Sequence, residues 1–344
     1  MPRIIQEGSV ELIVSKESKI SKKLPIFYNP VMKMNRDLSV LLLQALKKKD
    51  MNVLFPLAAS GVRGMRFLKE LDKKSVKMMH FNDCMDNYNV KIKKQLKHNK
   101  LEKEKRISIS NKDANLFILE NCGGDYIDID PFGSPVKFLC AAVEALSREG
   151  ILAVTATDTS ALSGTFLNAC KRKYWATPLH NEVMHEIGLR ILIRRVQLIG
   201  TTYDKALIPV LSYAKDHYMR VFFVCKKGKQ KCDGVVKQHD LYQDAGPLWT
   251  GALQDKTVLK KMIRLKSEHT EFLELLASEL DIVGFVDIHK LVKKHKLKDI
   301  PKTEKIISSL KKKGFKVSFT HVSPYGLKTN VSEKDVVTCL KSLI

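Results

Sequence analysis

The residues best suited to chemistry lie between Asp125 and Gly133, where a strand alternates apolar and acidic residues and then reaches Asp130, Pro131 and Phe132. In an open α/β sheet, ligands bind in the crevice beyond the carboxyl ends of the strands, and Asp130 is expected there. Pro131 would fix the backbone beside this carboxylate, and Phe132 would offer a flat apolar face. A carboxylate next to a stacking ring is suited to hold an aromatic amine in plane while the amine is alkylated.

Three further features are expected at neighbouring strand ends, and together they indicate a nucleoside site. A turn containing Gly61 and Gly64 lets the backbone pass close to a ligand between a strand and a helix. Asp83 ends the next strand about 20 residues later, where dinucleotide-binding folds place the acid that binds ribose hydroxyls. Asp113 follows the third strand. On pattern alone, two helix N-caps and an ordinary turn remain the alternative.

The type of cofactor follows from what the sequence lacks. It contains no Gly-x-x-x-x-Gly-Lys-Ser/Thr loop, and the turn has too few glycines for a pyrophosphate fingerprint. A nucleoside without phosphates fits better, which indicates S-adenosylmethionine (SAM). Methyl transfer from a sulfonium needs in-line positioning more than acid–base help. A carboxylate that accepts an N–H of guanine or adenine and takes its proton would assist attack, so we expect Asp130 to act as the catalytic acceptor. Phe132 would stack on a base that has left its helical context.

The elements that must position these residues alternate between short apolar strands and helices, the pattern of a doubly wound parallel sheet. Two later β-rich runs are spaced for a hairpin that closes one edge of the sheet. The expected strands of this part are 52–57, 78–81, 107–109, 125–130, 151–158, 207–213 and 218–225, and the expected helices are 36–49, 88–99 and one after Pro135.

The stretch 226–243 is basic and loop-like, and we predict the domain boundary there. Residues 1–235 would form the catalytic domain and residues 236–344 a smaller, mostly helical α+β domain that binds RNA. In this second domain, two short helices followed by a strand resemble a winged helix-turn-helix. The expected elements are helices at 257–280, 286–295, 302–313 and 332–343 and a strand at 315–321.

The charge of the chain indicates a nucleic-acid partner. Sixty Lys and Arg residues stand against 37 Asp and Glu residues, which gives a net charge of +23 over 344 residues. A lysine-rich proteome is the alternative explanation. Lysines cluster at 293–298 and 311–313, where they could track phosphates.

The remaining composition predicts a cytoplasmic protein without a metal. The sequence has no apolar run long enough to span a membrane and no signal-peptide core. Its seven cysteines are scattered, which is not the pattern of a secreted disulfide framework. Cys225, Cys232 and His239 lie near one another in the sequence but include no Cys-x-x-Cys pair, so lone thiols are expected rather than a zinc site.

The order of short motifs along nearly the whole chain resembles that of the tRNA guanine-N2 dimethyltransferases, which modify guanosine 26 with SAM. The matching segments are Phe27-Tyr28-Asn29-Pro30, Asn35-Arg36-Asp37, Ala59 to Phe67, Asn82-Asp83, Asp113-Ala114-Asn115, Asp130 to Pro135, Val154 to Asp158, His185-Glu186, Lys215 to Tyr218, Gly246 to Trp249 and Thr320 to Pro324.

The resemblance implies an α/β fold, with a Rossmann-like SAM-dependent methyltransferase domain, and a role for each matching residue. Arg36 and Arg63 would hold the methionine carboxylate, and Asp83 the ribose. Asp113 and the backbone of Ala114 would bind the adenine. The catalytic group would be Asp130, Pro131, Phe132 and Phe27, with the two phenylalanines stacking on the flipped guanine. Phe55 and Pro56 stand where the family has an acid, which leaves the local shape of the cofactor site open.

The predicted activity is methyl transfer to N2 of guanosine 26 of tRNA, giving N2-methyl- and N2,N2-dimethylguanosine, with no obligate protein partner. One alternative is a methyltransferase for another exocyclic amine, such as adenine N6. The other is an RNA-binding protein with a degenerate methyltransferase fold, although such a protein would not need charged residues at its strand ends.

Overall fold

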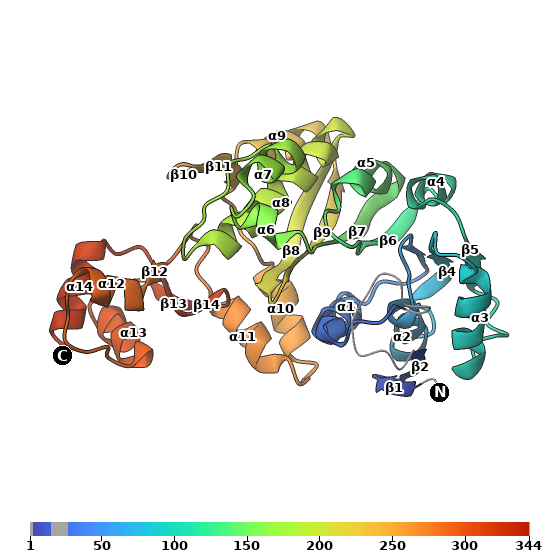
Figure 1. Ribbon diagram of the computed structural model, residues 1–344, viewed down its shortest axis with the longest axis horizontal. Coiled ribbons are helices and arrows are strands. Elements are labelled where there is room, and N and C mark those ends of the chain that lie inside the picture. Colours follow the sequence, from blue (N-terminus) through green and yellow to red (C-terminus); the bar gives the residue numbers. More distant parts are fainter. Residues whose placement is uncertain (1–2, 15–26, 344) are drawn as a thin grey trace.

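The computed structural model describes residues 3–14 and 27–343, which are built around a seven-stranded sheet (Figure 1). The strand order is β5-β4-β3-β6-β7-β9-β8. The five strands β5, β4, β3, β6 and β7 run parallel, whereas β9 is antiparallel to both β7 and β8. The strands are β3 (Met51–Phe55), β4 (Val76–Asn82), β5 (Ile107–Ser110), β6 (Gly124–Ile129), β7 (Leu146–Ala156), β8 (Lys205–Lys215) and β9 (Tyr218–Lys227). The predicted α/β fold is confirmed, and so is the closing hairpin, in which β8 is the edge strand.

Helices cover both faces of this sheet and bury two hydrophobic cores. Strand β6 contributes to both, because Tyr126 and Ile127 point to opposite faces. The Tyr126 face packs against α1, α2 and α3, and the Ile127 face against α4, α5 and α8. These helices are α1 (Lys33–Leu46), α2 (Val62–Glu70), α3 (Tyr88–His98), α4 (Ala114–Glu120), α5 (Val136–Ala145) and α8 (Met184–Thr202).

Two expected segments differ from the structure. The stretch 226–243 is not a loop: it contains α9 (Lys229–Val236), which buries Cys232 and Val235, and β10 (His239–Tyr242), which pairs with β11 (Ala245–Trp249). The expected helix 257–280 is two helices, α10 (Lys256–Ile263) and α11 (Thr270–Ser278). The chain reverses between them where Lys266 adopts a left-handed conformation with φ of 49°.

The C-terminal elements form a third core, which lies at one end of the molecule (Figure 1). This core contains two short helices followed by the hairpin β13–β14, the arrangement expected of a winged helix, although the sequence pattern missed β12 and β14. Its elements are β12 (Val286–Asp287), α12 (Ile288–Lys294), α13 (Thr303–Lys312), β13 (Val317–Thr320), β14 (Ser323–Thr329) and α14 (Glu333–Lys341). The boundary at residue 236 stays a prediction: residues from Ala245 to Leu276 contribute to the two sheet cores, and the third core begins at Ile288.

A buried ionic junction joins the third core to the sheet domain. The Nζ of Lys328, on β14, lies 2.7 and 2.8 Å from the two carboxylate oxygens of Glu186 on α8. Arg190, one turn along α8, donates to the same carboxylate at 2.9 Å and to the carbonyls of Trp249 and Gly251. Lys328, Glu186 and Arg190 are each 1% exposed or less, so this junction excludes water.

The N-terminal residues form a hairpin that the sequence pattern did not predict. Strands β1 (Arg3–Glu7) and β2 (Val10–Val14) pair antiparallel, and Val10 and Leu12 join the core on the α1 face. None of the helices within the described ranges is long and apolar enough to cross a membrane.

Candidate active site

A cavity of about 510 Å³ lies where the parallel strands β3 to β7 end, and it contains every predicted site residue. The cavity lies between the neighbouring strands β3 and β6. After β3 the chain continues to β4 on one side, and after β6 it continues to β7 on the other side. Open α/β sheets bind ligands at such a switch point. The predicted residues among its lining are Phe27, Arg36, Arg63, Asp83, Asp113, Ala114, Asp130, Pro131 and Phe132. The structure thus brings them together, while the role of each stays a prediction.

The glycine turn brings the N-terminus of α2 to the cavity wall. Gly61 caps this helix with φ of 74°, a conformation that side-chain-bearing residues rarely adopt. A Cβ at Gly64 would lie 2.3 Å from the Phe81 ring, so only glycine allows α2 to pack this closely on β4. The partial positive charge of the helix N-terminus then faces the cavity, where it favours an anionic group.

The two predicted cofactor carboxylates are held by backbone N–H groups. Asp83 accepts hydrogen bonds from Ala59 N at 2.9 Å and from Met85 N at 3.0 Å. Burial nevertheless raises the pKa of the Asp83 carboxyl above its ordinary value. Asp113 caps α4 by accepting from the N–H groups of Asn115 and Leu116, and it also faces the cavity. For Asp113, the cap and the cavity position therefore occur together.

Arg36 is oriented by a residue that sequence reasoning missed. Glu7, at the end of β1, accepts from Arg36 Nε at 2.7 Å and from Arg36 Nη2, and also from the Tyr28 hydroxyl at 2.7 Å. Burial raises the pKa of Glu7, but Arg36, the Tyr28 hydroxyl and Arg66 together outweigh burial and hold this pKa below its ordinary value. The sequence around Glu7 did not predict this contact, because the contact joins two residues that lie 29 positions apart.

Arg63 holds the carboxylate of Asp130. Its Nη2 lies 2.6 Å from Asp130 Oδ2, and its Nη1 donates to Asn35 Oδ1 at 2.8 Å and to Ser39 Oγ at 2.6 Å. Arg63 Nε lies 3.4 Å from Asp128. The side chain of Asp130 is 25% exposed, so one carboxylate is both fixed by a guanidinium and open to the cavity.

A buried ion pair lies beneath this site. Arg220, on β9, makes two parallel hydrogen bonds to the carboxylate of Asp128, at 2.8 and 3.0 Å, and also donates to Thr155. Burial raises the pKa of Asp128, yet Arg220 and Arg63 outweigh it and the pKa lies below its ordinary value. The sequence contained a signal for a buried charge, because Arg220 interrupts an otherwise apolar strand, but none for the identity of its partner.

The two predicted stacking rings touch each other. The centroids of Phe27 and Phe132 are 4.4 Å apart and their planes meet at 79°, an edge-to-face contact. A base between two parallel rings would need them about 7 Å apart, twice the contact distance between carbon atoms. Phe27 and Phe132 must therefore separate before a base can lie between them.

The loop that carries Asp130 is tied to the end of β7. Gly133 N donates to Thr157 Oγ1 at 2.6 Å, and Thr157 N donates to Gly133 O at 3.1 Å. Ser134 Oγ lies 3.0 Å from the hydroxyl of Tyr174, which donates to Asp158 at 2.6 Å. These contacts fix Phe132 and its neighbours relative to the sheet.

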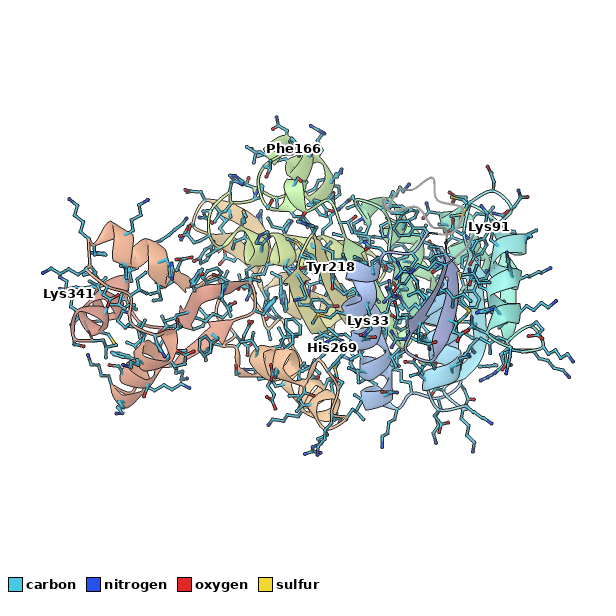
Figure 2. The ribbon with its side chains drawn as sticks, turned by 60° about the horizontal axis from the view of Figure 1, so that its bottom comes forward. Lys33, Lys91, Phe166, Tyr218, His269 and Lys341 are labelled. Atoms are coloured by element: carbon cyan, nitrogen blue, oxygen red, sulfur yellow. The ribbon has the colours of Figure 1, made fainter. Side chains whose placement is uncertain are left out.

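Cys225, Cys232 and His239 do not form a group of metal ligands in the described part of the chain; His239 instead lies 2.9 Å from the amide oxygen of Gln197. The one compact group of potential ligands among those residues is Asp37, Glu268 and His269. Lys33 and Arg66 already donate to its carboxylates, and Figure 2 shows Lys33 and His269 side by side. Cationic side chains thus neutralise this group.

Comparisons with known proteins agree with one another over the full chain. The profile of a family described as N2,N2-dimethylguanosine tRNA methyltransferase matches residues 8–245 and 236–341. A tRNA (guanine(26)-N(2)/guanine(27)-N(2))-dimethyltransferase of Aquifex aeolicus is 36% identical over a gapped alignment of 384 positions, which spans 99% of this chain and 96% of the relative. A tRNA (guanine(26)-N(2))-dimethyltransferase of Pyrococcus horikoshii is 34% identical and covers 98% of both chains. The solved structure of Trm1 from Pyrococcus horikoshii with S-adenosyl-L-methionine superposes with a TM-score of 0.89, at 33% identity, over 98% of this chain and 99% of that one.

Proposed function

Because this chain belongs to the N2,N2-dimethylguanosine tRNA methyltransferase family, we propose a role in its reaction for each residue of the cavity. The enzyme transfers methyl groups from SAM to the exocyclic N2 of guanosine in tRNA. The observation that supports the assignment best is the position of Asp130. Its carboxylate is held by Arg63 at 2.6 Å, open to the cavity, and next to Phe132.

The cavity fits SAM chemically. Asp83 and Asp113 offer carboxylate oxygens at adjacent strand ends, suited to ribose hydroxyls and to the adenine amine, with the backbone of Ala114 beside them. The N-terminus of α2 offers positive charge for the methionine carboxylate. Arg36 lies beside it, with its Nε and Nη2 on Glu7. Arg63 also lies here, but its donors already contact Asn35, Ser39 and Asp130, so binding that carboxylate would require an exchange of partners. When bound, SAM supplies the electrophilic methyl group.

The residues of this chain position the amine and remove its proton. Phe27 and Phe132 separate and stack on the flipped guanine, which brings N2 toward Asp130. The carboxylate of Asp130 accepts an N–H hydrogen bond and takes the proton as the bond from N2 to carbon forms and the bond from sulfur to that carbon breaks. Arg63 keeps the carboxylate in place, and Pro131 fixes the backbone between the acid and the ring.

We expect SAM to bind more weakly in acid, and we expect this loss to begin at a higher pH than it would at a site with an ordinary aspartate. Burial raises the pKa of Asp83, and a protonated carboxyl loses acceptor capacity toward ribose hydroxyls. Calorimetric titration with SAM across the acid range should show affinity decreasing as the pH falls through this raised pKa. Asp83→Asn should weaken binding by about 1.5–3 kcal/mol, the range for hydrogen bonds to charged groups, and abolish this pH dependence. The exposed neighbour Asp86 gives the matched control, since Asp86→Asn should leave both unchanged.

The proposed target is guanosine 26. Unmodified tRNA incubated with the enzyme and labelled SAM should yield N2-methyl- and N2,N2-dimethylguanosine, which fragment mapping should place at position 26. Methyladenosine without methylguanosine would instead identify an adenine N6 enzyme. Binding of tRNA and SAM with no transfer would identify a degenerate binding protein.

We also place the enzyme in the cytoplasm, where it would act without an obligate protein partner. All seven cysteines are free thiols, in keeping with a reducing compartment.

A further inference from the structure

A helical segment next to the catalytic loop has the properties of a nucleic-acid contact surface. It comprises α6 (Thr159–Leu162) and α7 (Leu167–Tyr174) and the residues around them. Residues 159–181 include no Asp or Glu, whereas the last turn of α7 carries Lys171, Arg172 and Lys173. Lys173 pairs with Asp158 at 3.1 Å, and Lys171 and Arg172 are exposed. The segment is thus a cationic surface within a chain that is itself strongly basic.

Apolar side chains are exposed among these cations. Phe166 is 61% exposed, Leu167 42% and Trp175 59%. Figure 2 shows Phe166 at the outer tip of the segment, directed away from the body of the molecule. Aromatic rings interleaved with cations are typical of surfaces that bind unpaired nucleotides, because rings stack on bases while the cations contact phosphates.

Trp175 is held in an exposed position by its surroundings. It ends α7 with φ of 55°, a left-handed conformation that is a genuine outlier for a bulky residue. The guanidinium of the buried Arg195 lies 3.6 Å from the centroid of its indole, and Arg194 donates to its carbonyl at 3.3 Å. Arg195 therefore covers one face of the ring, while Trp175 as a whole remains 59% exposed.

The segment is also fixed to the active site. Tyr174, the residue before Trp175, reaches Ser134 of the catalytic loop at 3.0 Å and Asp158 at 2.6 Å. Strained and exposed aromatic residues are costly, and such features cluster at functional sites where the surrounding structure maintains them. The cost is accounted for if the ring receives a ligand close to where the target base enters.

We propose that α7 and the residues at its two ends form a second tRNA contact surface, in which Trp175 is a stacking platform for an unpaired base and Lys171 and Arg172 bind phosphates. This proposal rests on the proposed function, since it assumes the same tRNA substrate. Charge decides between occupants: a second copy of this chain would also be basic, whereas RNA is the polyanion that a surface with an excess of cations attracts.

Substitution of Trp175 tests the stacking platform. Trp175→Ala should weaken tRNA binding about 5-fold or more, the lower range for loss of one base–aromatic stack. Trp175→Phe keeps a ring and should restore most of the affinity. SAM affinity and the rate at saturating tRNA should stay at wild-type values in both variants. Leu241→Ala is the matched control, because Leu241 is 61% exposed, close to the 59% of Trp175, and lies on β10.

Fluorescence gives a readout independent of activity. The chain has two tryptophans, and Trp249 is only 4% exposed. Binding of tRNA should quench the tryptophan emission of the wild type and should reduce the further quenching of this emission by added iodide. The tRNA-induced change should disappear in Trp175→Phe, whose remaining tryptophan is buried.

The phosphate contacts are tested by salt dependence. Lys171→Gln combined with Arg172→Gln should lower the slope of log affinity against log salt by about 2. The control pair, Lys93→Gln with Lys94→Gln, removes two exposed lysines from α3. This helix lies at another edge of the molecule, where Figure 2 labels its Lys91. The control pair should leave the slope unchanged.

The outcomes separate this proposal from the proposed function. Wild-type protein that methylates no tRNA would contradict the proposed function, whereas tRNA-dependent quenching of Trp175 could still occur. Methylation with wild-type affinity and salt slope in all α7 variants would overturn the α7 surface alone. A change in the molecular mass of RNA-free protein caused by Trp175→Ala would overturn it in favour of a contact between copies.

Discussion

Replacing Asp130 by Asn abolishes methyl transfer, we expect, while the protein still binds SAM and tRNA. Asparagine keeps the shape of the side chain but cannot take the amine proton, and general-base assistance contributes about 10²–10⁴-fold to rates. Arg63 loses its partner at 2.6 Å but retains Asn35, Ser39 and Asp128, so the cavity should keep its form. Single-turnover transfer of labelled methyl groups gives the rate, and calorimetry gives both affinities.

Asp125→Asn is the control for this experiment. Asp125 lies at the opposite end of β6, where it accepts from Asn52 N and Ser147 Oγ and does not line the cavity. Its amide variant should transfer methyl groups at the wild-type rate. Turnover by Asp130→Asn equal to that of wild type would remove Asp130 from the mechanism.

Arg220→Met should produce the largest loss of stability. The substitution leaves Asp128, which is 2% exposed, without its bidentate partner, and breaking a buried pair by removing one member costs about 3–5 kcal/mol. Urea unfolding should show a lower midpoint by a corresponding amount. Arg148→Met, at an exposed position on the neighbouring β7, should change the free energy of unfolding by about 0.5 kcal/mol or less.

Two further measurements identify the cause of that loss. Adding Asp128→Asn to Arg220→Met should recover part of the stability, because the double variant buries no unpaired charge. In the wild type, the lowered pKa of Asp128 means that the pair stabilises the fold above the ordinary carboxyl range and that this contribution is lost as the pH falls. The difference between wild type and Arg220→Met should therefore shrink in acid. A constant difference at all pH values would contradict an electrostatic origin.

The sequence was sufficient to predict the residues at the strand ends and their gathering in one cavity. Asp83, Asp113 and Asp130 follow strands whose order can be inferred from alternation, so their meeting at one edge follows from the topology. Helix breaks were harder. The expected helix 257–280 has apolar spacing on both sides of the interruption, and its reversal at Lys266 depends on packing against other elements rather than on a proline or glycine signal.

The ionic partners of the site could not be predicted, because they come from distant parts of the chain. Glu7 contacts Arg36 across 29 residues, and Arg220 contacts Asp128 across 92. Periodicity assigns each residue to an element and a face, but it does not say which two charges meet when elements pack. The edge-to-face contact of Phe27 with Phe132 is of the same kind, since it joins two residues that lie far apart in the sequence.

The junction of Lys328 with Glu186 and Arg190 has a consequence for the thermodynamics of recognition. If the C-terminal elements moved away from α8, the buried charges of Lys328, Glu186 and Arg190 would lose their partners. The two parts of the molecule therefore keep one relative orientation. The entropy of aligning them is lost when the protein folds and not when a ligand arrives. A ligand that touches both parts therefore meets a preorganised surface, and its affinity is not reduced by a domain-closure equilibrium.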